Sequence, residues 1–247
     1  MFFKIKIIYF LIKVKLEKLT GLYSSNWYKK INTFFFLKNL KSSKFYEFFN
    51  VYSSNFFELP IINKSLFMEN FNAINTCGIT YKQASEIAEK SELSRDFSPM
   101  INNVSVGLST GTSGNRGMFL VSETERANWV AYMIDRVIGF SFTKVEIAFF
   151  LRANNKLYES AKSRKVSFNF FDIFQNIDSH IERLNNLQPD ILIAQPSVLM
   201  ILSKKKVNGE LKINPRKIIS VAEVLTNEDR TYFESIFQIK LDEVYQC

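Results

Sequence analysis

Residues 190–207 read DILIAQPSVLMILSKKKV and join two elements of different periodicity. The segment Asp190–Ala194 predicts a short buried strand, because the four residues after the aspartate are apolar without alternation. Pro196 predicts the first turn of a helix, where a proline ring is tolerated. The run Lys204-Lys205-Lys206 would end that helix and complement its dipole, although it could also contact an anionic partner. A strand followed at once by a helix is typical of α/β proteins.

The same alternation continues on both sides of this stretch. Short connections join the expected elements, so the sequence predicts an α/β layered domain with a largely parallel sheet and flanking helices. The expected strands are Val145–Leu151, Val166–Phe170, Lys217–Ala222 and Ile239–Val244, and the expected helices are Ile177–Leu187 and Thr226–Phe237.

Earlier in the chain, two strands are expected to flank a loop. A helical stretch around Tyr81–Ser91 precedes a predicted strand at Val104–Leu108, and a second strand is expected at Met118–Val121. Ser122 and Glu125 have the spacing of a capping box, which predicts a helix directly after the second strand.

Charge and composition exclude several classes of protein. The chain has 247 residues, 23% charged and 15% aromatic, which excludes a disordered chain. Residues 1–50 carry ten lysines against two glutamates, whereas the rest has 22 basic and 22 acidic residues, so a general nucleic-acid binder is not expected. Cys77 and Cys247 are far apart, which predicts reduced thiols in a cytoplasmic protein. His180 is the only histidine, so no metal site is predicted.

The basic N-terminal segment permits two interpretations. Residues 1–20 read MFFKIKIIYFLIKVKLEKLT, and their longest uncharged stretch, Ile7–Ile12, is too short for a membrane span of about 20 residues. The segment is either an amphipathic helix packed on the body or a helix whose lysines contact anionic lipid at a membrane surface. Most aromatic residues of the clusters Phe34–Phe36 and Phe45–Phe49 are expected in the core.

One loop concentrates the glycines. Gly107, Gly111, Gly114 and Gly117 lie within eleven residues, in a chain with only 8 glycines. Glycines let backbone N–H groups approach an anion, and hydroxyl groups and an arginine add donors and charge. The spacing fits neither the Walker pattern nor the dinucleotide fingerprint, and a flexible turn is the alternative. The predicted phosphate-binding residues are Ser109, Thr110, Gly111, Thr112, Ser113, Gly114, Arg116 and Gly117.

Several motifs, in order along the chain, carry a resemblance. Leu108–Gly114 resembles the phosphate loop of the adenylate-forming (AMP-binding) superfamily, in its phenylacetate–CoA ligase-like branch. Leu59–Lys64 resembles the Leu-Pro-x-x-x-Lys segment of that branch, and Ala194–Ser197 its Pro-Ser turn. Ser220–Leu225 is similar to the adenine-contacting segment, and Tyr245–Cys247 to the start of the Tyr-x-x-Thr-Glu motif.

The resemblance implies a two-step ligase reaction. A carboxylic acid would attack the α-phosphate of ATP, with Mg²⁺, to give an acyl adenylate and pyrophosphate. A thiol, of which coenzyme A is one candidate, would then take the acyl group. By the resemblance Val221, Ala222 and Glu223 would lie along the adenine, and Tyr245 would stack on it.

The resemblance also implies what lies beyond the sequence. The family's Thr-Glu motif, its ribose-binding Asp and its mobile C-terminal lid domain would follow Cys247 and are absent here. We therefore expect residues 1–58 to form a basic, aromatic-rich helical segment and residues 59–247 an incomplete adenylation domain. Little activity is expected from these residues alone. The usual Pro-Lys after the loop is absent, and Arg116 is its only basic substitute.

Two other functions fit parts of the sequence. One is a non-catalytic α/β module docked to a membrane or acidic partner by its lysine-rich helix. The other is a serine hydrolase using Ser109 or Ser113 with His180, which the missing Gly-x-Ser-x-Gly elbow disfavours. Further candidates, for which solvated or core positions are favoured, are Asp172, Asp178, Glu182, Trp129, Tyr132, Asp242 and Glu243.

Overall fold

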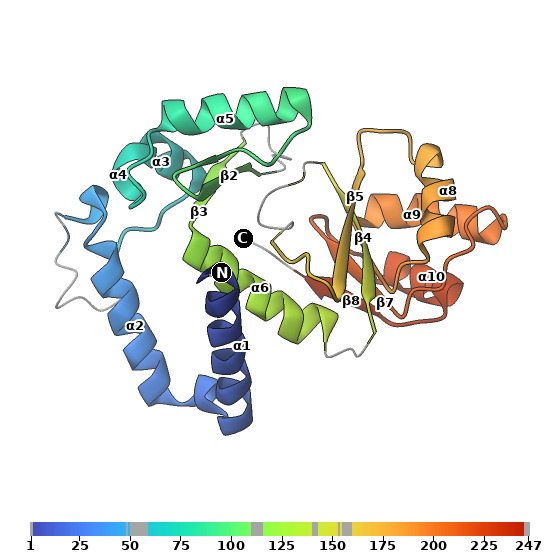
Figure 1. Ribbon diagram of the computed structural model, residues 1–247, viewed down its shortest axis with the longest axis horizontal. Coiled ribbons are helices and arrows are strands. Elements are labelled where there is room, and N and C mark those ends of the chain that lie inside the picture. The colour runs from blue at the N-terminus through green and yellow to red at the C-terminus, as the bar shows by residue number, and fades with distance from the viewer. Residues whose placement is uncertain are drawn as a thin grey trace. The chain divides into compact units, whose positions relative to one another are not determined.

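The computed structural model describes residues 2–47, 49, 59–109, 116–139, 143–152, 154 and 160–244. The chain divides into two compact units, Met1–Asp135 and Arg136–Cys247 (Figure 1). The sequence boundary between residues 58 and 59 adjoins residues 50–58, which lie outside the described part, and it stays a prediction.

The second unit contains a parallel sheet of five strands in the order β5-β4-β6-β7-β8. Its strand pairs are all parallel, so successive strands are joined by crossovers, and among the described residues helices lie in the connections that follow β5, β6 and β7 (Figure 1). This architecture confirms the predicted fold class. The strands are β4 (Val145–Leu151), β5 (Val166–Asp172), β6 (Ile191–Ala194), β7 (Lys217–Val221) and β8 (Leu241–Val244), and the helices are α8 (Asp178–Leu187), α9 (Pro196–Val207) and α10 (Asn227–Phe237).

Alternate strand residues of this sheet form one hydrophobic core with the three helices. Phe150, Leu192 and Ile218 come from neighbouring strands, and Leu199 of α9 and Phe233 of α10 pack with them. Side chains two residues apart share a face of a strand, so this face is built from every second residue. Truncating such a buried leucine typically costs about 2–5 kcal/mol.

The first unit carries a small antiparallel sheet in the order β1-β2-β3. The strands are β1 (Met100–Ile101), β2 (Val104–Leu108) and β3 (Met118–Val121), so both strands predicted beside the loop are confirmed. The sheet packs with the helices before it through Phe71, Ile79, Ala84, Val104 and Met118. These helices are α3 (Lys64–Glu69), α4 (Phe71–Ile74) and α5 (Tyr81–Ser94).

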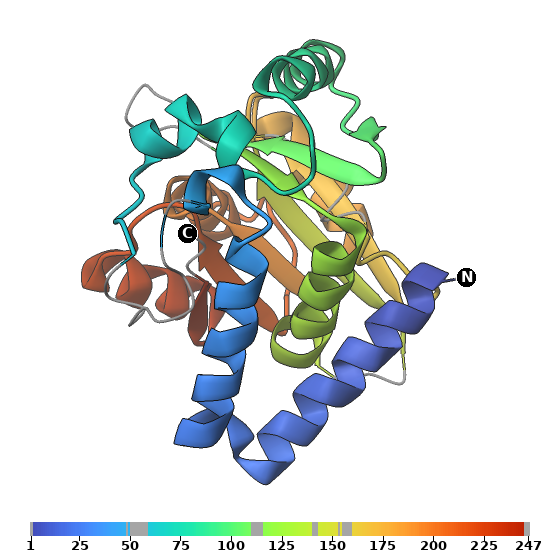
Figure 2. The same ribbon diagram turned by 90° about the vertical axis from the view of Figure 1, so that its left-hand side faces the viewer.

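The N-terminal segment is helical, as predicted. In this unit, α1 (Phe2–Thr20) packs against α6 (Glu123–Met133), which begins at the expected capping box of Ser122 and Glu125. Gly21, at a φ of 64°, ends α1, and the chain continues into α2 (Asn26–Leu40) (Figure 2). Shorter turns of helix are η1 (Leu22–Ser24), η2 (Lys44–Tyr46) and the π-helical η4 (Ile134–Ile138).

The expectation that the N-terminal aromatic residues are core is wrong for α2. This helix has no buried residue, and Phe34, Phe35 and Phe36 are exposed. Consecutive residues of a helix point in different directions, so three adjacent phenylalanines cannot all face one core.

Candidate functional site

Two hydrogen bonds between Ser109 and Gly117 close the base of the hairpin formed by β2 and β3. We call this pair of residues the neck. Leu108 of β2 pairs with Met118 of β3, and beyond them Ser109 N–H donates to the Gly117 carbonyl at 2.7 Å. Gly117 N–H in turn donates to Ser109 Oγ at 2.8 Å. Ser109 therefore fixes both sides of the neck, and its hydroxyl oxygen is already an acceptor there. Five of the predicted phosphate-binding residues lie outside the described part, and their role stays a prediction: Thr110, Gly111, Thr112, Ser113 and Gly114.

Lys64 lies against the same neck. It begins α3, which is capped by Asn63 Oδ1 accepting from Leu66 N–H at 2.8 Å. A Cβ placed on Gly117 would stand 3.1 Å from Lys64 Cε and 3.4 Å from Ser109 Oγ. Because there is little room for a side chain at residue 117, glycine lets the lysine stem lie close to the loop. Lys64, the last residue of the Leu59–Lys64 segment quoted for the resemblance, thus lies beside Gly117 at the end of the loop.

Arg116 connects the neck to the helix α5. Its Nε donates to the Ser109 carbonyl at 3.3 Å, and its terminal amino groups donate to both carboxylate oxygens of Glu92 on α5. These hydrogen bonds raise the pKa of the Arg116 guanidinium, so the group stays charged. The charge that the sequence predicted for phosphate is compensated here by a carboxylate.

In the second unit, two other quoted segments meet at the carboxyl ends of β6 and β7. Ala194 is in register with Ser220, so the Pro-Ser turn and the predicted adenine segment follow neighbouring strands. Glu223 accepts hydrogen bonds from Ser197 N–H at 3.1 Å and from Ser197 Oγ at 2.9 Å. Its carboxylate therefore sits at the N-terminus of α9, where negative charge is favourable.

Ala222 has a backbone conformation typical of glycine. Its φ is 66°, in the left-handed region, and the next residue, Glu223, donates its N–H to the Val221 carbonyl at 2.9 Å. The chain thus turns tightly right after β7. The left-handed region costs a residue with a Cβ roughly 1–2 kcal/mol.

Two buried polar atoms stand at the same edge of the sheet. Gln195 Oε1 and Ser220 Oγ have no hydrogen-bond partner within the part of the chain that the structure describes, and both residues are buried. Buried polar atoms are usually paired, and an unpaired one is destabilising. Ligands of open α/β sheets bind outside the carboxyl ends of the strands, which is where these atoms lie.

His180 is a buried structural residue. Its Nε2 lies 3.0 Å from the Asp172 carbonyl, which can only accept, so Nε2 carries the proton. Its ring packs edge-on against Phe150 and Phe171. The ring is thus held in place by carbonyl and aromatic contacts rather than by a nucleophile.

Several other charged candidates form ion pairs or lie at a helix end. Asp178 pairs with Lys205 at 2.7 Å, and Lys206 donates to the Ile213 carbonyl at 2.6 Å, as expected for a lysine run that ends a helix. At the end of the sheet, Asp242 pairs with Lys217 at 2.9 Å and Glu243 with Arg230 at 2.8 Å. Tyr245 lies outside the described residues.

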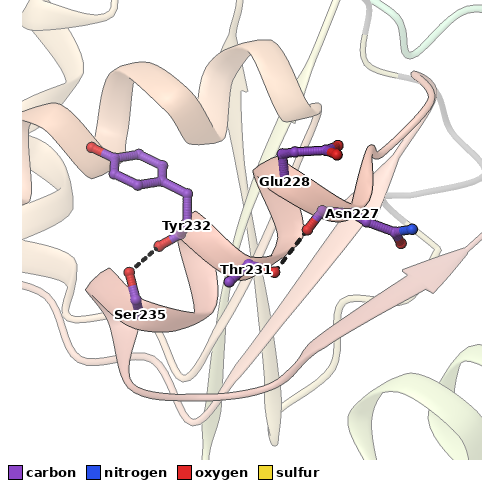
Figure 3. Close-up of a pocket in the computed structure, with 5 residues that line it drawn as sticks. All are labelled: Asn227, Glu228, Thr231, Tyr232 and Ser235. Carbon is purple, nitrogen blue, oxygen red and sulfur yellow. Dashed lines mark hydrogen bonds between the residues drawn. The ribbon is translucent and has the colours of Figure 1, made fainter.

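A shallow hollow lies on α10. Figure 3 shows that its lining residues all come from this one helix: Asn227, Glu228, Thr231, Tyr232 and Ser235. The Thr231 hydroxyl donates to the Asn227 carbonyl at 2.8 Å and the Ser235 hydroxyl to the Tyr232 carbonyl at 2.7 Å. Across the described residues, no group of three or more His, Cys, Asp or Glu side chains could hold a metal ion.

Comparison with known proteins gives likenesses among solved structures and none at the level of sequence. No family model matches the chain, and no curated protein matches it. Among solved structures, an open conformation of 2-hydroxyisobutyryl-CoA ligase in complex with 2-HIB-AMP and CoA is similar at a TM-score of 0.43 and 14% identity. The alignment covers 63% of this chain and 40% of that chain, so the chain spans less than half of the ligase. A likeness at this level assigns no residue or ligand to this chain.

Proposed function

We propose that the chain is part of an ATP-dependent, adenylate-forming ligase of the phenylacetate–CoA ligase-like branch, and that it works in the cytoplasm. The observation that carries the proposal is the hairpin neck, where Ser109 and Gly117 hold each other by two hydrogen bonds. The Ser/Thr/Gly residues of the motif lie between these two residues in the sequence. The backbone N–H groups of such a loop can surround an anion.

The proposed reaction uses this loop for the departing phosphates. A carboxylate oxygen of the acid attacks the α-phosphorus of ATP, and the bond to the bridging oxygen of pyrophosphate breaks. Donors placed on the β- and γ-phosphates stabilise the charge that develops there. Lys64, whose stem lies over Gly117, would add positive charge beside the neck, in a loop that lacks the family's Pro-Lys.

The edge of the parallel sheet would receive the nucleoside. Residues Val221, Ala222 and Glu223 form a tight turn anchored on Ser197, so their backbone would offer a fixed strip along the adenine. The unpaired Gln195 Oε1 and Ser220 Oγ add buried acceptor capacity at this edge. Mg²⁺ would accompany ATP as its counter-ion, and no cluster among the described residues is assigned to it.

The second step would regenerate the nucleotide site. A thiol, with coenzyme A as the candidate, attacks the acyl carbon of the adenylate, the thioester bond forms, and AMP leaves with the electron pair of the broken acyl–oxygen bond. The acid and the thiol would both be substrates of the whole protein.

Nucleotide binding, rather than turnover, tests the proposal. At a nucleotide concentration near 100 times Kd, ATP should raise the melting temperature by roughly 5–10 °C. Gly114→Val should remove this protection, because a branched side chain would displace the phosphates from the backbone amides. Thr231→Val on α10 is the control, since its hydroxyl binds only a carbonyl of its own helix at 2.8 Å. Equal protection of wild type and Gly114→Val would refute the phosphate loop.

A further inference from the structure

The first helix exposes a continuous apolar face. Its residues follow one another at alternating steps of three and four, so they lie on one side of the helix. They are between 53% and 82% exposed, and we refer to them as the outer face of α1: Phe2, Ile5, Tyr9, Ile12, Leu16 and Leu19. The opposite side of α1, with the buried Val14, packs in the same unit that contains α6. The helix is therefore apolar on two sides, and the residues that the structure describes cover only one of them.

The second helix adds exposed aromatic residues. Trp27, Phe34, Phe35 and Phe36 of α2 are between 48% and 66% exposed. Figure 2 shows α1 and α2 as consecutive helices joined by a short turn. Large apolar groups gathered on one helical hairpin indicate a binding surface, whereas single exposed ones are ordinary.

Lysines border the outer face of α1 on both sides. At 3.6 residues per turn, Lys4 and Lys15 lie on one side of the stripe and Lys6 and Lys13 on the other. Lys6 pairs with Glu123 at 2.8 Å and Lys15 with Asp135 at 2.5 Å, yet these lysine side chains remain 41% and 51% exposed. The Lys6–Glu123 pair is exposed on both sides and therefore weak, so an anion at the border can compete for the Lys6 ammonium group. Lys15 stays with Asp135, whose carboxylate is 2% exposed.

The net charge of the N-terminal segment indicates which partner can cover the outer face of α1. Residues 1–50 carry ten lysines and two glutamates, a net +8 that equals the net charge of the whole chain. Two copies of α1 pairing through their outer faces would bring lysine borders together, which is unfavourable. An anionic surface would be attracted instead. No helix in the described part of the chain is long and apolar enough to cross a bilayer, so such a helix would lie along the surface.

We propose that the outer face of α1, with Trp27 and Phe34, which share one side of α2, docks the protein on an anionic phospholipid membrane. The apolar side chains enter the boundary between headgroups and acyl chains, and the bordering lysines contact lipid phosphates. This docking is independent of the nucleotide site, since it uses only the N-terminal hairpin.

Vesicle co-sedimentation of the full chain tests the proposal. The probes are vesicles of phosphatidylcholine alone and of an equimolar mixture with phosphatidylglycerol. We expect binding to the anionic vesicles at about 0.1 M salt and its loss at about 1 M salt, where the screening length falls from about 10 to 3 Å. Trp27 fluorescence should shift to shorter wavelength on binding, and a Trp27→Phe variant should lack that shift.

Two pairs of matched variants make the test specific. Ile12→Gln with Leu16→Gln should weaken binding by more than about tenfold, while Leu93→Gln with Val207→Gln, at 87% and 61% exposed positions elsewhere, should not. Lys4→Gln with Lys13→Gln should weaken binding by about fivefold per lysine, while Lys82→Gln with Lys240→Gln should leave it unchanged.

Three outcomes overturn the proposal. One is no sedimentation with anionic vesicles at low salt, and another is equal binding by the outer-face variant and its control. The third is a combination of results: light scattering shows a dimer for wild type and a monomer for the outer-face variant, and neither protein binds vesicles. That result would assign the surface to a second copy of the chain.

Discussion

Glu92 and Arg116 tie the helix α5 to the base of the glycine-rich loop. Arg116 Nη1 lies 2.5 Å from Glu92 Oε2, and Nη2 contacts the other carboxylate oxygen. The two side chains are 27% and 25% exposed, so the pair is partly shielded from water. A bidentate pair restrains orientation as well as distance. The loop neck is thus held by a helix that is 24 residues away in sequence.

Breaking this pair should loosen the loop. Arg116→Lys cannot donate in a fork, and Glu92→Gln loses the charge, so each variant should lower the free energy of unfolding by about 1–2 kcal/mol. Each should also reduce the stabilisation by ATP, because the neck would no longer be fixed. Urea unfolding and melting with and without ATP measure both effects.

The control variants make the same two kinds of substitution, Arg→Lys and Glu→Gln, at other positions of the chain. Arg164→Lys and Glu182→Gln alter exposed residues away from the pair, and neither should change ATP stabilisation. If Glu92→Gln instead increases stabilisation by ATP, the carboxylate competes with phosphate for Arg116 and does not position the loop.

Local patterns predicted the elements of this region well. The strands Val104–Leu108 and Met118–Val121 occur as expected, and the Ser122 capping box forms with Glu125 N–H donating to Ser122 Oγ at 3.3 Å. Each of these depends on residues close together in the sequence, where propensity and spacing act. The parallel sheet also follows from local alternation, because strands joined by helices lie parallel.

Contacts between distant segments could not be predicted in this way. Glu92 was one of several acidic residues on an exposed helix, with no local sign that it would meet Arg116. Lys64 was quoted only as part of a motif, and its position over Gly117 depends on how α3 packs beside the hairpin. The exposed phenylalanines of α2 were misjudged because apolar area favours burial only where a partner surface exists.

The left-handed Ala222 gives a second prediction. Ala222→Gly should relieve roughly 1–2 kcal/mol of backbone strain, offset in part by the greater freedom of glycine in the unfolded chain. We expect a free energy of unfolding equal to or up to about 1 kcal/mol above that of wild type. Chemical denaturation measures the difference.

A helical alanine provides the comparison. Ala73→Gly in α4 has no strain to relieve and should lower the free energy of unfolding by about 0.5–1 kcal/mol. Equal losses at both positions would show that residue 222 does not need its left-handed conformation in the folded protein.

The contact of Asp135 with α1 predicts a pH dependence. Asp135 Oδ1 lies 2.5 Å from Lys15 Nζ, the carboxylate is 2% exposed, and Lys18 Nζ lies 3.6 Å from Oδ2. The hydrogen bond from Lys15 lowers the pKa of Asp135 below its usual value of 3.8. A carboxyl whose pKa is lower in the folded state stabilises the fold fully above its unfolded pKa, and this stabilisation is lost as the pH falls through the folded pKa.

Asp135→Asn should therefore lower the free energy of unfolding by up to about 1 kcal/mol at neutral pH, since both lysines are largely exposed. The difference from wild type should shrink as the pH falls below 3.8. Urea unfolding at neutral and acidic pH tests this, with Glu69→Gln, an exposed residue of α3, as the control that shows no such change. If the free energy of unfolding of Asp135→Asn is lower than that of wild type by the same amount at every pH, the packing of the Asp135 side chain, and not its charge, holds α1 in place.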